Sequence, residues 1–134
     1  MEEALQKAIY DALTASPSMS VRDDIPTPAD AGDKTKFPYV TVGECAVIPF
    51  DTDDSSGGDA TISVNTWSRY KGRKETKNLQ AEIYERLHRQ ELTIDGFDFI
   101  ACDFLSSESF LDEDGKTRHG ISRFRVLMEQ QSPT

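Results

Sequence analysis

The chain has few of the residues that build metal sites and disulfides. Its 134 residues include only two cysteines and two histidines. Cys45 and Cys102 lie in strand-like segments without CxxC spacing, and together with His88 and His119 they form no zinc-binding pattern. We therefore expect buried free thiols, with no metal and no cofactor.

Long apolar runs and a basic N-terminus are also absent. No apolar stretch approaches the length of a membrane span, and the start, MEEALQKAIYDAL, lacks the basic and apolar regions of a secretory signal. We expect a soluble protein that is made inside the cell and has no membrane partner. With 37% hydrophobic residues, the chain has the composition of one ordinary domain over residues 1–134.

Positive charge is scarce as well. The 15 lysines and arginines are outnumbered by 24 aspartates and glutamates, which leaves a formal net charge of −9. Binding to phosphates needs clustered basic side chains that displace counterions, so tight DNA binding is not expected. An acidic wall would instead suit a conduit through which DNA slides without sticking.

Two segments carry apolar residues at helical spacing. In Glu2 to Ala15 these are Leu5, Ala8, Ile9, Ala12 and Leu13. The acidic side chains of Glu2 and Glu3 complement the dipole at the start of this first helix. In the second segment, Gly72 to Gln90, the stripe is formed by Thr76, Leu79, Ile83 and Leu87. Both segments are predicted to be amphipathic helices.

Other segments alternate in the manner of strands: Tyr39 to Ile48, Thr61 to Trp67, Phe97 to Phe104, and a last one after the turn dipeptide Asp114-Gly115. In the last strand Phe124, Val126 and Met128 share one face, and Arg123, Arg125 and Leu127 share the other. Ser18 to Arg22 and Leu92 to Ile94 are shorter strand candidates. The order predicts an α+β fold in which an antiparallel or mixed sheet is packed on one face by two helices.

Four segments are predicted to lie outside the helices and strands. Residues 23–36 contain Pro26, Pro28 and Gly32, and residues 49–59 are acidic with a Gly57-Gly58 pair that we interpret as a flexible joint. We expect mobile loops at 23–36 and 49–59, a polar connection from Ser106 to Ser109, and a frayed tail at 130–134.

Three groups of residues, in this order, resemble a known family. They are Phe37-Pro38-Tyr39-Val40; Val64 to Trp67 with Gly72; and Asp114-Gly115 with Arg118-His119-Gly120 and Phe124-Arg125-Val126. The chain resembles the tail-completion proteins of long-tailed bacteriophages, also called tail terminators or minor tail components. The resemblance runs from the N-terminal helix to Met128.

The resemblance implies a structural virion protein instead of an enzyme. Such a protein is assembled in the host cytoplasm and forms a ring, hexameric in the family, on the head-proximal end of the tail tube of a siphophage. The ring ends tube polymerisation and offers a surface for joining the head. Its implied partners are further copies of itself, the tail tube protein and a head-completion or connector protein, while DNA passes through without tight binding.

Charged residues in the loops are our candidates for these contacts. The two loops hold Asp30, Lys34, Asp51, Asp53, Asp54 and Asp59, and the tip of the last hairpin holds Asp112, Asp114 and Arg118. A calcium loop starting at Asp51 fails, because its sixth position is Ser56 instead of glycine and its twelfth is Ile62 instead of glutamate. Solvated assembly loops are therefore favoured, and the acidic hairpin tip is interpreted as a solvated turn.

Two alternatives of other classes remain open. A small enzyme or ligand-binding domain could use a polar site near His119, although no nucleophile elbow or fixed triad order accompanies it, and no catalytic residue is assigned. An acidic DNA mimic would need carboxylates along one rigid face, whereas many here fall in loops. The single tryptophan, Trp67, is expected in the core or at a subunit interface.

Overall fold

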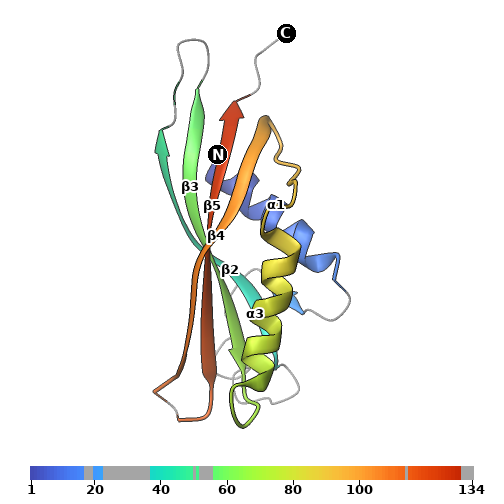
Figure 1. Ribbon diagram of the computed structural model, residues 1–134, viewed down its shortest axis with the longest axis vertical. Coiled ribbons are helices and arrows are strands. Elements are labelled where there is room, and N and C mark those ends of the chain that lie inside the picture. Colours follow the sequence, from blue (N-terminus) through green and yellow to red (C-terminus); the bar gives the residue numbers. More distant parts are fainter. Residues whose placement is uncertain (17–19, 23–36, 50, 52–55, 114, 131–134) are drawn as a thin grey trace.

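The structure is a computed structural model that describes residues 1–16, 20–22, 37–49, 51, 56–113 and 115–130 (Figure 1). Within these residues the chain forms α1 (Glu2–Thr14), β1 (Val21–Arg22), β2 (Tyr39–Pro49), β3 (Gly57–Ser68), α3 (Lys74–Leu87), β4 (Phe97–Leu111) and β5 (Arg118–Gln130). Helices and strands do not alternate as βαβ units, so the α+β class predicted from the sequence is confirmed.

The strands form one mixed sheet in the order β1-β2-β3-β5-β4. The pairs β2 with β3, β3 with β5 and β5 with β4 are antiparallel. Short β1 adds a parallel edge through Val21 opposite Val40. Because β1 covers only the start of β2, the second half of β2 and the whole of β4 lie at the two edges of the described sheet.

The prediction of a loop at 49–59 is wrong at both ends of this segment, where the residues belong to strands. Pro49 is the last residue of β2 and pairs with Gly58, while Gly57 pairs with Glu129 across β5. Gly57 and Gly58 are buried, so they are not a flexible joint; a Cβ at Gly58 would collide with the Met1 side chain. The neighbouring strands β2 and β5 supply hydrogen-bond partners for the backbone of Gly57 to Asp59. The polar sequence of this stretch does not by itself indicate a strand. The remaining predicted loop residues, 23–36, 50 and 52–55, lie outside the described residues.

Two other strand boundaries differ from the prediction. β4 continues through Ser106 to Ser109, predicted to be a connection, because this stretch pairs with β5 as far as Leu111. Leu92 to Ile94 forms no strand of its own and contributes only an isolated bridge from Ile94 to Phe97. Gly96 permits the tight turn between these two residues through its φ of +82°.

Both helices bury the stripes that their spacing predicts, except that Ala12 of the first stripe is only partly buried. In α1 the buried residues are Leu5, Ala8, Ile9 and Leu13, and in α3 they are Thr76, Leu79, Gln80, Ile83 and Leu87. α3 is shorter than predicted and ends before His88. His88, just beyond the helix, accepts a hydrogen bond on Nδ1 from the Phe104 N–H at 3.0 Å and stacks on Tyr84. It therefore fastens the end of α3 to β4.

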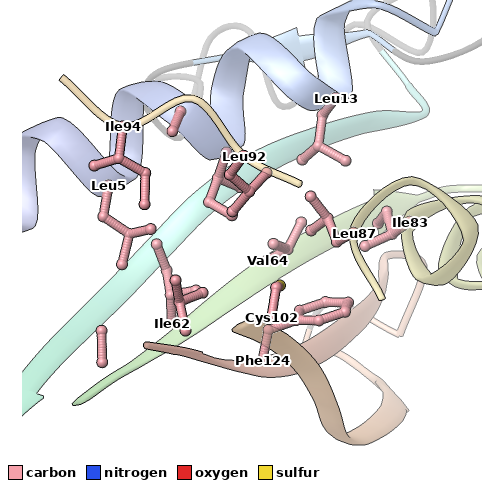
Figure 2. Close-up of a cluster of buried hydrophobic side chains, with 14 of the residues drawn as sticks. Leu5, Leu13, Ile62, Val64, Ile83, Leu87, Leu92, Ile94, Cys102 and Phe124 are labelled. Atoms are coloured by element: carbon pink, nitrogen blue, oxygen red, sulfur yellow. The ribbon is translucent and has the colours of Figure 1, made fainter. Parts of the chain in front are cut away.

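One hydrophobic cluster joins the helices to the sheet. Figure 2 shows Leu5 and Ile83, from the two helices, directed toward Ile62, Val64 and Phe124 of the sheet. In Figure 1 both helices lie to the right of the sheet. Among the described residues, neither helix combines the length and the apolar character needed to cross a membrane.

Candidate assembly surface

The strands alternate between buried residues and residues of a second face, which we call the open face. On β3 the buried set includes Ile62 and Val64, and the open face carries Thr61, Ser63 and Asn65 between them. On β5 the same alternation places Arg123, Arg125 and Leu127 on the open face, as predicted. This face is therefore polar or mixed where the other is apolar, and it remains partly exposed in the single chain.

Two arginines of β5 form ion pairs across the open face. Arg125 donates two hydrogen bonds to Asp59, from Nε at 2.9 Å and from Nη2 at 2.7 Å. These hydrogen bonds hold the pKa of Asp59 below its ordinary value. Arg123 Nη2 lies 3.1 Å from Glu108 Oε1 on β4. The pairs fix neighbouring strands against each other, although exposed pairs of this kind add at most about 1 kcal/mol each.

An aromatic row crosses the open face at the end where β2 begins. It consists of Phe37, Tyr39, Trp67, His119 and Phe110, so that β2, β3, β5 and β4 each contribute a ring. The tightest contact is between Trp67 and His119, whose ring centroids lie 3.9 Å apart with an interplanar angle of 12°. Trp67 also donates its indole N–H to Thr41 Oγ1 at 3.3 Å. Trp67 thus belongs to a packed surface layer of the sheet.

His119 takes part in this row as a packing residue. Its Nε2 lies 3.0 Å from Asn65 Oδ1, and Phe110 meets its ring edge-on at 5.0 Å between centroids. Burial lowers the pKa of His119, against the opposing effect of the Asp112 and Glu108 carboxylates. A neutral imidazole held between two aromatic rings and an amide is positioned by the sheet, and this arrangement does not match the pocket that the enzymatic alternative requires.

The edge strand β4 exposes large apolar side chains. Ile100, Leu105 and Phe110 are 45%, 50% and 43% exposed. Ile100 and Leu105 are the extra residues of two β-bulges, which interrupt the pairing with β5 between Phe99 and Ala101 and between Phe104 and Ser106. Sequence reasoning missed this surface, because it ended the strand at Phe104 and did not consider bulges.

The charged residues predicted as contacts fall at opposite ends of the sheet. In Figure 1, β2 ends and β3 begins at the top, whereas β4 ends and β5 begins at the bottom. At the first end, Asp51 is exposed and accepts a 3.4 Å hydrogen bond from the Gly57 N–H, whereas Asp59 lies within β3 and is paired with Arg125. The prediction of Asp59 as a loop residue is therefore wrong. Asp30, Lys34, Asp53 and Asp54 lie outside the described residues.

At the second end, Asp112 closes the hairpin. Its N–H donates to the Thr117 carbonyl at 2.7 Å, and its own carbonyl accepts from the Gly115 N–H at 2.9 Å. Gly115 has a φ of +70°, the left-handed conformation that the Asp-Gly dipeptide predicts for the turn. Arg118 is the first residue of β5, opposite Leu111, and so stands beside the tip instead of on it. Asp114 lies outside the described residues.

The two cysteines are free thiols in environments that suppress reactivity. Burial raises the pKa of Cys102 to about 12 and also raises that of Cys45. Within the part of the chain that the structure describes, no group of three His, Cys, Asp or Glu side chains could hold a metal ion.

The family assignment follows from comparison with known proteins. The model of the family "Tail completion protein gp17" matches residues 7–129. The chain belongs to this family. A member from Bacillus phage SPP1, also named tail completion protein gp17, is 30% identical over 126 residues, which is 93% of this chain and 92% of the relative. The resemblance noted from the sequence is thereby confirmed.

Solved structures agree with this assignment. The structure of bacteriophage SPP1 gp17 is 28% identical and has a TM-score of 0.59, with 92% of this chain and 88% of that chain covered. A chain in the virion of a native gene transfer agent particle has the same fold, with a TM-score of 0.83, 20% identity and 96% of both chains covered. The protein is a structural component of the phage tail and virion, and it is not an enzyme.

Proposed function

We propose that this protein forms a ring on the head-proximal end of the tail tube, where it ends tube polymerisation and provides the surface for joining the head. Membership of the tail completion family is the observation that carries this proposal. The ring consists of copies of this chain, six in number by family resemblance, and its other partners are the tail tube protein and a head-completion or connector protein. It is assembled in the host cytoplasm and ends up at the head-tail interface of the virion.

The shape of the sheet supports a ring subunit with two different partners. A closed ring needs head-to-tail contacts, in which one patch meets a different patch on the neighbour. Among the described residues, the second half of β2 and the outer side of β4 are edges available for such contacts, and the helices lie on the side opposite the open face. The two ends of the sheet carry different charged groups, with Asp51 at the β2–β3 end and Asp112 with Arg118 at the β4–β5 end. We assign these ends to the partners above and below the ring.

The remaining charged positions complete this proposal. Asp30, Lys34, Asp53, Asp54 and Asp114 contribute to the same contacts, while Asp59 acts by holding Arg125 in place at the β2–β3 end. The net charge of −9 favours passage of DNA through the ring without retention, because like charges repel.

A deletion of the coding sequence in the phage tests the proposed function. Without the protein, electron microscopy of lysates should show tail tubes of uncontrolled length together with heads that carry no tail. Supplying the wild-type protein, or the control variant Glu85→Ala at an exposed position of α3, should restore joined particles of uniform tail length. Joined particles with tails of normal length in the deletion strain would refute the proposal.

A further inference from the structure

The first half of α3, Lys74 to Ala81, lies over small polar residues of the sheet. The face of β3 and β5 that carries the apolar core continues there with four small buried residues, Thr66, Ser68, Gly120 and Ser122. A side chain at position 120 would collide with Thr66. Its Cβ would also lie 2.7 Å from Gln80 Nε2 and 3.0 Å from Thr76 Cγ2, so these two helix residues pack directly on the Gly120 backbone.

Three buried hydroxyl groups in this contact have no hydrogen-bond partner among the described residues. They belong to Thr66, Thr76 and Ser122, whose side chains lie in residues that are 1% exposed or less. A buried hydroxyl without a partner gives up its hydrogen bonds to water and gains none in return, which disfavours the buried state. Water would satisfy all three hydroxyls once the first half of α3 moved away from the sheet.

Polar contacts also fasten the first half of α3 at its two ends. The Ser68 hydroxyl donates a hydrogen bond to Glu75 Oε1 at 2.6 Å, and Gln80 Nε2 donates to the Glu108 carbonyl of β4 at 2.9 Å. Leu79 is the one large apolar side chain in this half. Arg73, which precedes the first turn, makes no side-chain capping hydrogen bond within the described part of the chain.

The second half of α3 is held differently. Ile83 and Leu87 are fully buried in the hydrophobic cluster. Just beyond the helix, His88 accepts the hydrogen bond from the Phe104 N–H and so ties this end of α3 to β4. Burial of large apolar side chains contributes more stability than exchanging hydrogen bonds with water for hydrogen bonds within the protein. The second half is therefore the anchor of the helix.

Open space flanks the first half of α3 on both sides. A groove of about 340 Å³ lies toward Pro38 and Tyr70, and another of about 320 Å³ lies toward Phe104 and Ser107 of β4. Residues 70–73, which connect β3 to α3, are exposed. The surroundings therefore leave room for this half of the helix to tilt while the core below the second half stays packed.

We propose that Lys74 to Ala81 form a lid that lifts from the sheet by pivoting on the anchored second half of α3. Lifting hydrates the three hydroxyls and breaks the hydrogen bonds that Glu75 and Gln80 make with the sheet. The lid gives this side of the protein two shapes while the hydrophobic cluster stays folded. It is a property of the single chain and does not depend on ring formation.

Amide hydrogen exchange of the purified protein, followed by nuclear magnetic resonance, tests the lid. The amides of Asn78 to Ala81 should be protected at least about tenfold less than those of Tyr84 to Leu87, and to a similar degree as one another, because the lid lifts as a unit. Equal protection in both halves of the helix would overturn the proposal. Protection that rises steadily from Asn78 onward would show ordinary fraying and would also overturn it.

The variant Thr66→Val links the exchange to the hydroxyls, because valine has the shape of threonine without its hydroxyl. It should raise the protection of Asn78 to Ala81 about fivefold or more, since the closed lid no longer buries an unpartnered group. Thr61→Val is the matched control, because Thr61 is exposed on the opposite face of the same strand, and it should leave the protection unchanged.

Unchanged or reduced protection in Thr66→Val would show that the hydroxyl is satisfied under the closed lid, and would overturn the proposal. Thr76→Val makes the same test from the helix side if Thr66→Val fails to fold. All of these measurements use the single chain, so their outcomes are independent of whether the protein forms a ring.

Discussion

At the scale of single residues, His119 illustrates how a side chain can be held by surface packing alone. Its ring lies against Trp67 and Phe110 with Asn65 at Nε2, and burial lowers its pKa in the folded chain. In the unfolded chain His119 has its ordinary pKa of 6.5, so as pH falls the unfolded chain binds a proton at His119 before the folded chain does. The stability that neutral His119 contributes is therefore fully present above pH 6.5. It is lost as pH falls from there toward the lower pKa of His119 in the folded chain.

We therefore expect the free energy of unfolding to decrease from about pH 7.5 to about pH 5, partly because of His119. Urea unfolding measured across this range checks the expectation. The variant His119→Phe keeps an aromatic ring against Trp67 but does not titrate, so its decrease should be shallower than that of the wild type. Identical pH slopes for both proteins would show that His119 does not contribute.

At the scale of elements, α3 is held by a few side chains that the helical spacing identifies. Ile83 is fully buried in the cluster with Phe124 and Val64. Ile83→Ala should lower the free energy of unfolding by about 2–5 kcal/mol, because it loses transfer energy and leaves a cavity between helix and sheet.

Urea unfolding by circular dichroism measures this cost. Glu85→Ala serves as the matched control, since Glu85 is exposed on the same helix and should change stability by no more than about 0.5 kcal/mol. Equal costs for the two variants would contradict the packing of α3 described above.

At the scale of the whole molecule, one hydrophobic cluster contains buried residues from both helices, α1 and α3, and from each of the long strands β2, β3, β4 and β5. We therefore expect residues 1–134 to unfold as one domain. Fluorescence of the single tryptophan, Trp67, reports on the open face, and far-ultraviolet circular dichroism reports mainly on the helices. The two signals should share one urea midpoint, whereas a separate midpoint for Trp67 would indicate that the sheet and the helices unfold independently.

The sequence alone determined the elements whose burial follows a simple local period. The stripe of Leu79, Ile83 and Leu87 and the alternation of Phe124, Val126 and Met128 are both buried as predicted, because a helix or strand against one core must repeat its apolar residues at 3.6 or 2 positions. The turn at Gly115 also followed from its dipeptide, and the family followed from the order of short motifs.

Only the tertiary structure decided the features that depend on a distant partner. Gly57 to Asp59 became part of a strand because β2 and β5 flank it, and Asp59 found Arg125 66 positions away. The exposure of Ile100 and Leu105 depends on the register between β4 and β5, because these two residues are the extra residues of the bulges in that pairing. Such information lies in the pairing between strands, and no single segment of the chain contains it.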